Sequence, residues 1–193
     1  MRFFRRMVAV LVLVAAGMVQ AAPFDDAVAA YKQGDYATAE RGFRALALQG
    51  DASSQYNLGW MYANGQGVPK DDQQAVFWYR KAADQGHAKA QYNLGFMYAK
   101  GEGVPKDDQQ AVSWYRKAAD QGNASAQYNL GLMYAKGEGV PKDDQLAYFW
   151  WLLSSVSGDA SSIKNRDIVE AKLTSQKRAT AQAHARDWKP RKQ

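Results

Sequence analysis

ASSQYNLGWMYANGQGVPKDDQQAVFWYRKAADQGH, residues 52–87, is the stretch of sequence that decides the fold. The next 36 residues, 88–123, repeat it without a gap and agree with it at 29 of 36 positions, and residues 124–159 form a third unit in the same register. The string QYNLG occurs once in each unit, and so does GVPKDD. Self-similarity at a fixed period of this length is the signature of repeat architectures.

The first half of each unit predicts an amphipathic helix. In residues 52–64, Leu58, Met61 and Tyr62 follow helical spacing, and Gly65 lies just beyond, where a left-handed residue commonly ends a helix. Three glycines interrupt the predicted helices at one equivalent position: Gly59, Gly95 and Gly131. Because glycine inside a helix costs about 1 kcal/mol relative to alanine, its recurrence predicts a close contact between helices there.

The second half of each unit predicts another helix. Asp71 stands where an N-cap belongs, and Gln74 three residues later predicts a capping box. The spacing i, i+3, i+4, i+7 predicts a buried face of Ala75, Trp78, Tyr79 and Ala82. Neither helix can bury its apolar face alone, so the units are expected to stack into an all-α solenoid.

Two motifs that suggest chemistry are better explained by this architecture. Pairs of aspartates recur at 71–72, 107–108 and 143–144, which raises the possibility of paired catalytic carboxylates or a metal site. Each pair lies at a helix start, where capping and the helix dipole favour acids, so capping is the preferred interpretation. The GQG and GEG strings do not follow a strand and are not predicted to bind phosphate.

The charge of the chain is divided unevenly. Residues 23–159 carry 13 basic and 16 acidic side chains, a net of −3, whereas residues 160–193 carry nine basic and three acidic ones, a net of +6. A nucleic-acid-binding protein would be expected to spread basic residues over its main surface, so no nucleic-acid partner is predicted. The absence of cysteine excludes disulfides and thiolate metal sites.

Residues 1–22 have the order of a secretory signal peptide. Three arginines in residues 1–6 precede an apolar run from Met7 to Val19, and small residues follow at Ala21–Ala22. The run is shorter than the ~20 residues that a membrane span needs, so cleavage near Ala21–Ala22 is expected, with an uncleaved anchor as the alternative. We therefore expect an exported, most simply periplasmic, chain, with secretion possible and no integral membrane segment after cleavage.

The pattern A-x-A-Q-Y-N-L-G-x-M-Y-x-x-G-x-G-V-x-x-D, followed by A-x-x-W-Y-x-K-A-A-x-x-G, is similar to the Sel-one-like repeat, a relative of the tetratricopeptide repeat. The resemblance covers residues 52–87, 88–123 and 124–159. It implies a right-handed α-solenoid of stacked helix pairs whose members mostly act as non-enzymatic adaptors between proteins. Many bacterial members are exported. No cofactor or metal is implied, and we expect a monomer that binds a protein or peptide partner.

The segments that flank the repeats resemble caps. Residues 23–51 look like a looser tetratricopeptide-type helix pair, and residues 160–193 resemble closing helices followed by a basic tail. The third unit has Leu152 and Leu153 where the earlier units have Arg-Lys, so its second helix is apolar nearly all round. A helix of this kind is buried, and residues 160–188 are therefore predicted to cover Phe149, Trp150 and Leu153.

In the tetratricopeptide relatives, the first helix of each pair lines a concave groove. The resemblance places these residues, with Ser53, in such a groove: Tyr56, Asn57, Trp60, Asn64, Tyr92, Asn93, Phe96, Lys100, Tyr128, Asn129, Leu132 and Lys136. Trp60, Phe96 and Leu132 occupy one equivalent position that varies but stays large and apolar, as binding hot spots do. The alternative is that these three side chains pack against the helix of the next unit.

Two other functions remain alternatives. Some cysteine-rich exported Sel-one-like proteins are associated with β-lactam binding or hydrolysis, but this chain lacks cysteine and has no S-x-x-K or G-x-S-x-G motif. His87 lies at a unit boundary and is interpreted as a polar linker residue, and His184 lies on a basic helix. The basic residues near the C-terminus could also contact anionic lipid or wall polymer, although a solvated charged end is the preferred interpretation.

Overall fold

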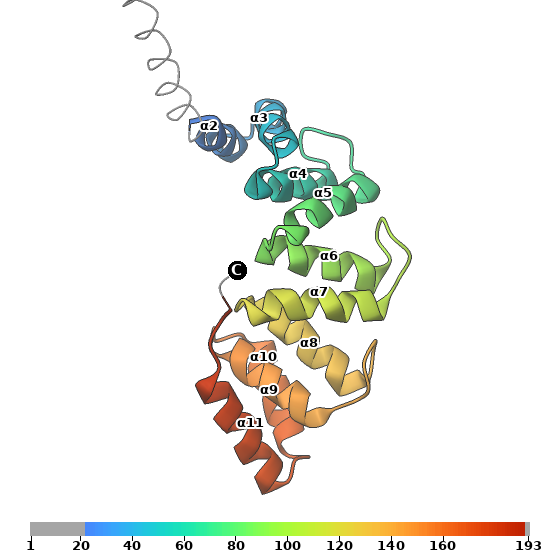
Figure 1. Ribbon diagram of the computed structural model, residues 1–193, viewed down its shortest axis with the longest axis vertical. Helices are drawn as coiled ribbons and strands as arrows, with labels where there is room; N and C mark the ends of the chain where they lie inside the picture. Colours follow the sequence, from blue (N-terminus) through green and yellow to red (C-terminus); the bar gives the residue numbers. More distant parts are fainter. Residues whose placement is uncertain (1–21, 192–193) are drawn as a thin grey trace, which may run out of the picture.

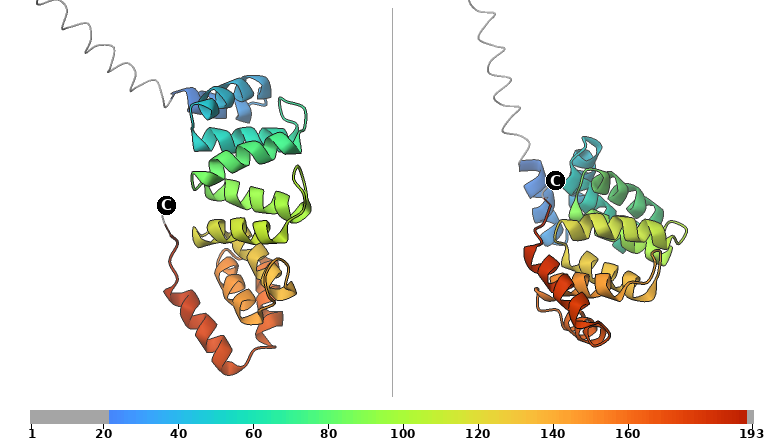
Figure 2. Two further views of the ribbon diagram at one scale, coloured as in Figure 1. Left: turned by 45° about the vertical axis from the view of Figure 1, so that its right-hand side comes forward. Right: turned by 60° about the horizontal axis from the view of Figure 1, so that its bottom comes forward.

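The computed structural model describes residues 22–191, and every regular element in that part of the chain is an α-helix. Consecutive helices stack into a curved column with α2 at one end and α11 at the other (Figures 1 and 2). The described helices are α2 (Ala22–Lys32), α3 (Tyr36–Leu48), α4 (Ala52–Asn64), α5 (Asp72–Asp84), α6 (Ala88–Lys100), α7 (Asp108–Asp120), α8 (Ala124–Lys136), α9 (Asp144–Ser155), α10 (Ala160–Glu170) and α11 (Ser175–Asp187). The predicted all-α solenoid of stacked helix pairs is confirmed.

The first helix of each unit begins and ends where local sequence signals place it. At the start of α4, the Asp51 carboxylate accepts a hydrogen bond from the Ser54 backbone N–H at 2.6 Å. At its end, Gly65 is left-handed, with φ of 66°, and its N–H donates to the Met61 carbonyl. The same glycine C-cap follows α6 and α8. The predicted limits of 52–64 are therefore confirmed.

The second helix of the unit has its predicted N-cap but not the predicted capping box. The Asp71 carboxylate accepts from the backbone N–H groups of Gln73 and Gln74, both at 3.0 Å. The Asp71 N–H donates to the Tyr62 carbonyl at 3.0 Å instead of to the Gln74 side chain. The capping-box prediction is wrong because the chain folds back on α4 and supplies a main-chain acceptor first.

The two helices of a unit touch at the mid-helix glycine, as predicted. A Cβ placed on Gly59 would lie 2.8 Å from Cδ1 of Tyr79, which is closer than a real Cβ tolerates. Gly95 and Gly131 meet Tyr115 and Trp151 in the same way. The other members of the predicted buried face, Ala75, Trp78 and Ala82, are buried too. Close packing at the glycine therefore sets the distance between the helices of a pair.

The loop inside each unit packs on the preceding unit. Gly103 has a φ of 68°, and a Cβ there would lie 2.2 Å from the backbone carbonyl oxygen of Asp72, at the start of α5. Gly139 stands in the same relation to Asp108. Both positions need glycine for the left-handed conformation and for the close backbone approach. These glycines therefore serve the stacking of the units rather than phosphate binding.

Buried glutamines join one unit to the next. The amide groups of Gln55, Gln91 and Gln127 each donate to a backbone carbonyl eight residues earlier, at 3.1, 3.0 and 3.2 Å. Gln85 and Gln121 then donate to the Gln55 and Gln91 oxygens, both at 2.7 Å. A buried amide without partners would cost free energy, so the bonds to carbonyl groups of the preceding helix pair fix the register between neighbours, while Gln85 and Gln121 satisfy the glutamine oxygens from within the same unit.

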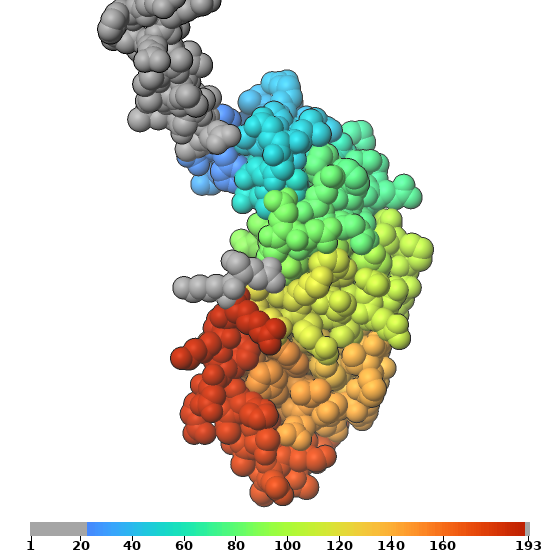
Figure 3. Space-filling view, in the orientation of Figure 1, coloured from blue at the N-terminus to red at the C-terminus, as the bar shows by residue number. Residues whose placement is uncertain are grey.

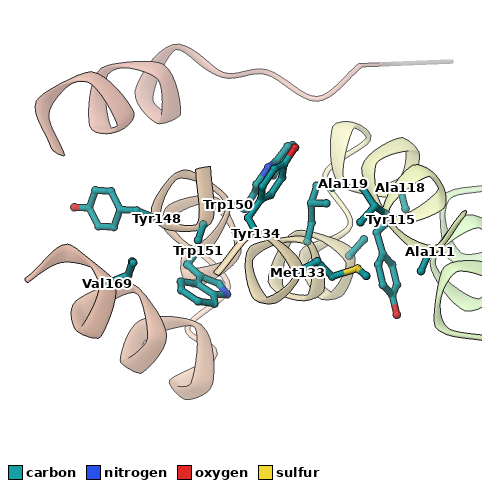
Figure 4. Close-up of a cluster of buried hydrophobic side chains, with 14 of the residues drawn as sticks. Ala111, Tyr115, Ala118, Ala119, Met133, Tyr134, Tyr148, Trp150, Trp151 and Val169 are labelled. Carbon is teal, nitrogen blue, oxygen red and sulfur yellow. The ribbon is translucent and has the colours of Figure 1, made fainter. Parts of the chain in front are cut away.

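The C-terminal helices pack on α9 of the third unit. Of the three residues that they were predicted to cover, only Trp150 is fully buried, to the same degree as its equivalents Trp78 and Trp114 in the earlier units, while Phe149 and Leu153 are half-buried. Trp150 is buried, and Phe149 and Leu153 pack against the same apolar cluster, which includes Val169 of α10 and Ala181 of α11. Figure 4 shows the labelled side chains of this cluster, with Val169 on α10 beside the residues of α9. The Tyr148 hydroxyl accepts a hydrogen bond from the Gln182 amide at 2.9 Å. Both α10 and α11 therefore pack on α9.

His87 is an N-cap rather than a simple linker residue. Its Nδ1 accepts a hydrogen bond from the Ala90 N–H at 3.2 Å, and its ring stacks on Tyr56 with centroids 4.7 Å apart. Asp51, Asn123 and Asp159 cap the equivalent helices in the same way. Burial lowers the pKa of His87 below its ordinary value, with Lys89 acting in the same direction. The neutral ring is therefore the form that the fold uses.

The stability of the chain is expected to fall as the pH drops below about 6.5, because protonation removes the His87 cap. The unfolded chain takes up the proton at higher pH than the folded chain does, so the stabilisation is complete above that pH. Loss of one N-cap costs about 1 kcal/mol. Urea unfolding at about pH 7.5 and about pH 5 measures this loss of stability. His87→Asn should remove this pH dependence, since Asn123 makes the same bond at 2.9 Å; an equal loss in both proteins would contradict the assignment.

The predicted leader lies outside the described residues. Within residues 22–191, none of the helices has the length and apolar character needed to cross a membrane.

Candidate functional site

The thirteen residues predicted to form a groove all lie on the first helices of the three units, α4, α6 and α8. Each of them lines at least one of four neighbouring pockets: Ser53, Tyr56, Asn57, Trp60, Asn64, Tyr92, Asn93, Phe96, Lys100, Tyr128, Asn129, Leu132 and Lys136. The pockets have volumes of about 310 to 420 Å³ and follow one another from unit to unit. We call this row of pockets the groove.

Two pockets form the centre of the groove. The pocket between the first and second units has a volume of about 420 Å³ and lies between Trp60 and Phe96. The pocket between the second and third units has a volume of about 340 Å³ and lies between Phe96 and Leu132. Phe96 also lines a third pocket, beside Tyr128. The equivalent apolar positions of the three units therefore form the walls between successive pockets.

The three wall residues differ in exposure. Trp60 is 40% exposed and Phe96 is 36% exposed, which is unusual for aromatic side chains in a chain of this size. Leu132 is half-buried and packs against the apolar cluster of α8 and α9 while also lining its pocket. The alternative of packing within the solenoid therefore applies in part to Leu132, whereas Trp60 and Phe96 present their rings to the solvent.

Trp60 is held in place by the N-terminal helix pair. Its indole N–H donates to the Tyr31 hydroxyl at 3.0 Å, and that hydroxyl donates to Oε1 of Gln66 at 2.7 Å. Tyr31 comes from α2, outside the three repeats, so the periodicity of the sequence contained no signal for it. This chain of hydrogen bonds fixes the orientation of an exposed ring before any partner arrives.

Buried tyrosines also line the two central pockets. Tyr79 lines the first and Tyr115 the second, and both rings press against the mid-helix glycines of their own units. Burial raises the pKa of both hydroxyls above the ordinary tyrosine value, and a hydrogen bond from Asn93 partly opposes this rise at Tyr79. The hydroxyls are therefore neutral over the whole physiological range and can offer only neutral hydrogen bonds.

Some polar groove residues already have partners, and others do not. Asn64 donates to the Trp60 carbonyl at 2.8 Å, and the Lys136 ammonium lies 3.7 Å from Glu138. Within residues 22–191, the side-chain amides of Asn57 and Asn129 make no hydrogen bond. A side-chain amide can both donate and accept hydrogen bonds, so these two groups can bind the backbone of a peptide.

The rim of the groove carries charges of both signs. Lys106 lies 3.3 Å from Asp108, and Lys70 lies 3.5 Å from Asp72. The second aspartate of each Asp-Asp pair thus forms an ion pair with a lysine of the loop, while the first aspartate caps the helix. In the part of the chain that the structure describes, no group of three or more histidine, aspartate or glutamate side chains is placed to hold a metal ion.

One pocket extends beyond the predicted set. Next to Tyr92 and Tyr128, it is also lined by Ser154, Ser157 and Ser161, which belong to the end of the third unit and to α10. The sequence reasoning missed these serines because the 36-residue pattern breaks at this point. The C-terminal cap therefore contributes one wall of the groove.

Comparison with known proteins agrees with this architecture. The Sel1 repeat family model matches residues 52–87, 88–123 and 124–159. A solved structure of a protective antigen present in uropathogenic Escherichia coli strains, which displays an SLR fold, is 38% identical with a TM-score of 0.72, over 78% of this chain and 32% of that one. A Sel1 repeat protein from Oxalobacter formigenes is 32% identical with a TM-score of 0.67, over 79% of this chain and 65% of that one.

The chain thus spans about a third of the length of the first of these proteins and just under two thirds of the second. A search of curated proteins gave no match. The family model nevertheless covers more than half of the sequence, in three consecutive units, and the helix pairs of the structure coincide with them. This chain therefore belongs to the Sel1 repeat family.

Proposed function

We propose that this protein is a non-enzymatic scaffold that binds a peptide segment of a protein partner in the groove. Sel1 repeat proteins are generally protein-interaction scaffolds, and the fold is typically non-catalytic. The observation that carries the proposal for this chain is the pair of exposed, oriented aromatic rings, Trp60 and Phe96, on either side of one pocket. Aromatic residues in such positions dominate binding energy in protein interfaces.

The surroundings of the two rings support a peptide as the ligand. Apolar walls at one equivalent position in successive units can each take a side chain of the partner, and the amides of Asn57 and Asn129 can pair with its backbone. The Lys100 ammonium lies 5.8 Å from the centroid of the Phe96 ring, within the range of a cation–π interaction. Mixed charges along the rim favour a partner of low net charge.

The double variant Trp60→Ala and Phe96→Ala tests the groove. We expect the affinity for the partner to fall by about 2–4 kcal/mol, as hot-spot truncations do. The free energy of unfolding should fall much less than the ~3–5 kcal/mol that each aromatic truncation costs in a core, because both rings are already exposed. The partner is captured on the immobilised chain from an envelope extract, and its affinity is then measured by calorimetry beside urea unfolding.

Phe77→Ala is the matched control. Phe77 is 48% exposed, similar to Trp60, but it lies on α5 and lines none of the four pockets of the groove. The Phe77→Ala substitution should leave the affinity for the partner unchanged. Unchanged affinity in the double variant together with a collapsed unfolding midpoint would show that Trp60 and Phe96 serve the solenoid instead.

We also propose that the protein is exported to the cell envelope with cleavage near Ala21–Ala22, most simply as a periplasmic monomer. The support is the charged start, the short apolar run and the small residues that follow it in residues 1–22. The intact mass of the protein recovered from cells tests this proposal. Recovery from the membrane pellet of a form that keeps its N-terminal arginines would overturn it.

A further inference from the structure

The chain turns back on itself after α11. Trp188 ends the helix in an extended conformation, and the segment that follows runs from α11 to the end of α7 (Figures 1 and 2). There the Arg191 backbone N–H donates to the Asp120 carbonyl at 2.8 Å, and the Arg191 guanidinium lies 3.6 Å from the Asp120 carboxylate. One residue of α7 thus receives both a main-chain hydrogen bond and an ion pair from the C-terminal segment.

Pro190 and Trp188 of the C-terminal segment lie over Gly122, in the turn that follows α7. Gly122 has a φ of 88°, and a Cβ there would lie 3.5 Å from Cγ of Pro190 and 3.7 Å from Cη2 of Trp188. The proline and the tryptophan therefore lie over that turn with room for one Cβ between them and Gly122. In the space-filling view the C-terminal segment reaches the indented side of the molecule, beside α7 (Figure 3).

The end of α7 has the chemistry to hold a cation and an N–H donor. The last carbonyl groups of a helix lack partners within the helix, and its C-terminus carries a partial negative charge. Asp120 adds a full negative charge where a basic residue is usually favoured. Lys117, one turn earlier, lies over the Trp114 ring at 3.9 Å. Arg191 supplies a donor to the Asp120 carbonyl and a cation to the Asp120 carboxylate.

The same surface occurs one unit earlier. The sequence RKAADQG at residues 80–86 is identical to residues 116–122. α5 ends at Asp84 as α7 ends at Asp120, Gly86 has the same φ of 88° as Gly122, and Lys81 lies over the Phe77 ring at 5.0 Å. We call residues 84–86 and 120–122 the acidic edge. The third unit lacks it, because Val156 stands in place of the aspartate.

We propose that the acidic edge is a second docking surface, separate from the groove, for a basic extended segment that contains proline, and that the chain's own C-terminal segment occupies its Asp120 half. Charge complementarity supports this occupant, since residues 23–159 have a net charge of −3 and residues 160–193 a net charge of +6. Asp84 is exposed, whereas Asp120, beneath Arg191, is partly covered.

The contact between Arg191 and Asp120 is weak enough for a competing segment to replace it. The Arg191 side chain remains 80% exposed, and an exposed ion pair contributes little and is screened by salt. The attached segment keeps its place mainly because tethering gives it an effective concentration on the order of millimolar. A free segment of the same chemistry therefore competes only when it is abundant or when the attached one is weakened.

Nuclear magnetic resonance of the ¹⁵N-labelled chain from Ala22 onward tests the proposal. At low salt, Arg191→Ala should shift the Gly122 amide resonance and leave the Trp60 indole resonance in place. Arg186→Ala, another exposed arginine near the end of α11, is the control and should shift neither. Raising the salt concentration should move the wild-type Gly122 resonance toward its position in Arg191→Ala.

A titration then examines the surface itself. The unlabelled peptide Trp-Lys-Pro-Arg-Lys-Gln, the sequence of residues 188–193, is added to the Arg191→Ala chain. We expect saturable shifts at Gly122 and Gly86, weaker by several-fold at high salt, which Asp120→Asn and Asp84→Asn abolish at their own sites. A peptide with glutamate in place of its lysines and arginine should produce none.

Three results would overturn the proposal. The first is a Gly122 resonance that is the same in the wild type and in Arg191→Ala, which means that the segment does not dock in solution. The second is an equal response to the acidic peptide, and the third is a response that survives both aspartate substitutions. Because Trp60 serves as an internal reference, these outcomes are independent of whether the groove binds its partner.

Discussion

A chain that stops at Asp159 is expected to aggregate instead of unfolding reversibly, because it leaves α9 without its cover. Tyr148 is 1% exposed in the intact chain and lies in one cluster with Val169 and Ala181, from α10 and α11. Trp150 and Trp151 belong to the same cluster. Each large apolar side chain that becomes exposed to water lowers the free energy of unfolding by about 1.5–3 kcal/mol. Light scattering after gel filtration and the reversibility of thermal unfolding measure the outcome.

A point substitution in the intact chain separates lost cover from a general effect of truncation. Val169→Asp places a charge at a site that is 3% exposed and should cost on the order of 3 kcal/mol or more. Its neighbour Ile168 is 51% exposed, so Ile168→Asp is the matched control and should change the stability by less than about 0.5 kcal/mol. A truncated chain that stays monomeric with unchanged melting would show that α9 is covered in another way.

The second large effect is expected at the mid-helix glycine of the third unit. In Gly131→Val, the new Cβ would start 2.6 Å from Nε1 of Trp151 and 2.8 Å from two other atoms of the ring. The ring is buried and its N–H donates to the Tyr128 carbonyl at 3.1 Å, so it cannot move aside without losing that bond. Overpacking and the lost hydrogen bond together should cost about 3 kcal/mol in urea unfolding.

Ala179→Val provides the comparison for a branched residue in a helix. Ala179 is exposed in the middle of α11, so this substitution tests helix propensity alone and should cost well under 1 kcal/mol. Gly131→Val with a loss no greater than that of Ala179→Val would mean that α8 and α9 separate easily. The glycine would then be unnecessary for the packing of the helix pair.

The parts of the fold that the sequence predicts are those governed by local chemistry. Helix limits follow from caps that lie within four residues of the groups they satisfy, such as Asp71 and Gly65. The contact at Gly59 was predictable because a residue that weakens a helix recurs at one position in every unit. The repeat also predicted that equivalent positions form a row, since units of the same sequence stack in order, whereas the resemblance to tetratricopeptide proteins was needed to place that row in a groove.

The capping box at Gln74 shows where this reasoning fails. Its signature is local, but the Asp71 N–H finds the Tyr62 carbonyl, which the loop brings within 3.0 Å. The buried glutamines were missed for a related reason. A polar residue in a helix is ordinarily read as exposed, and only the stacking of units supplies the carbonyl groups that Gln55 and Gln91 need.

The sequence by itself determined the repeat, the helix pairs and the N-caps, because each depends on short-range chemistry that recurs every 36 residues. It also put Trp60 and Phe96 at one equivalent position of successive units. Tertiary structure alone decided that Tyr31 fixes the Trp60 ring, that Leu132 is half-buried and that Arg191 returns to Asp120. Those contacts join residues 29 to 71 positions apart or depend on the non-repeating ends of the chain. No period relates such residues, so only the packed molecule brings them together.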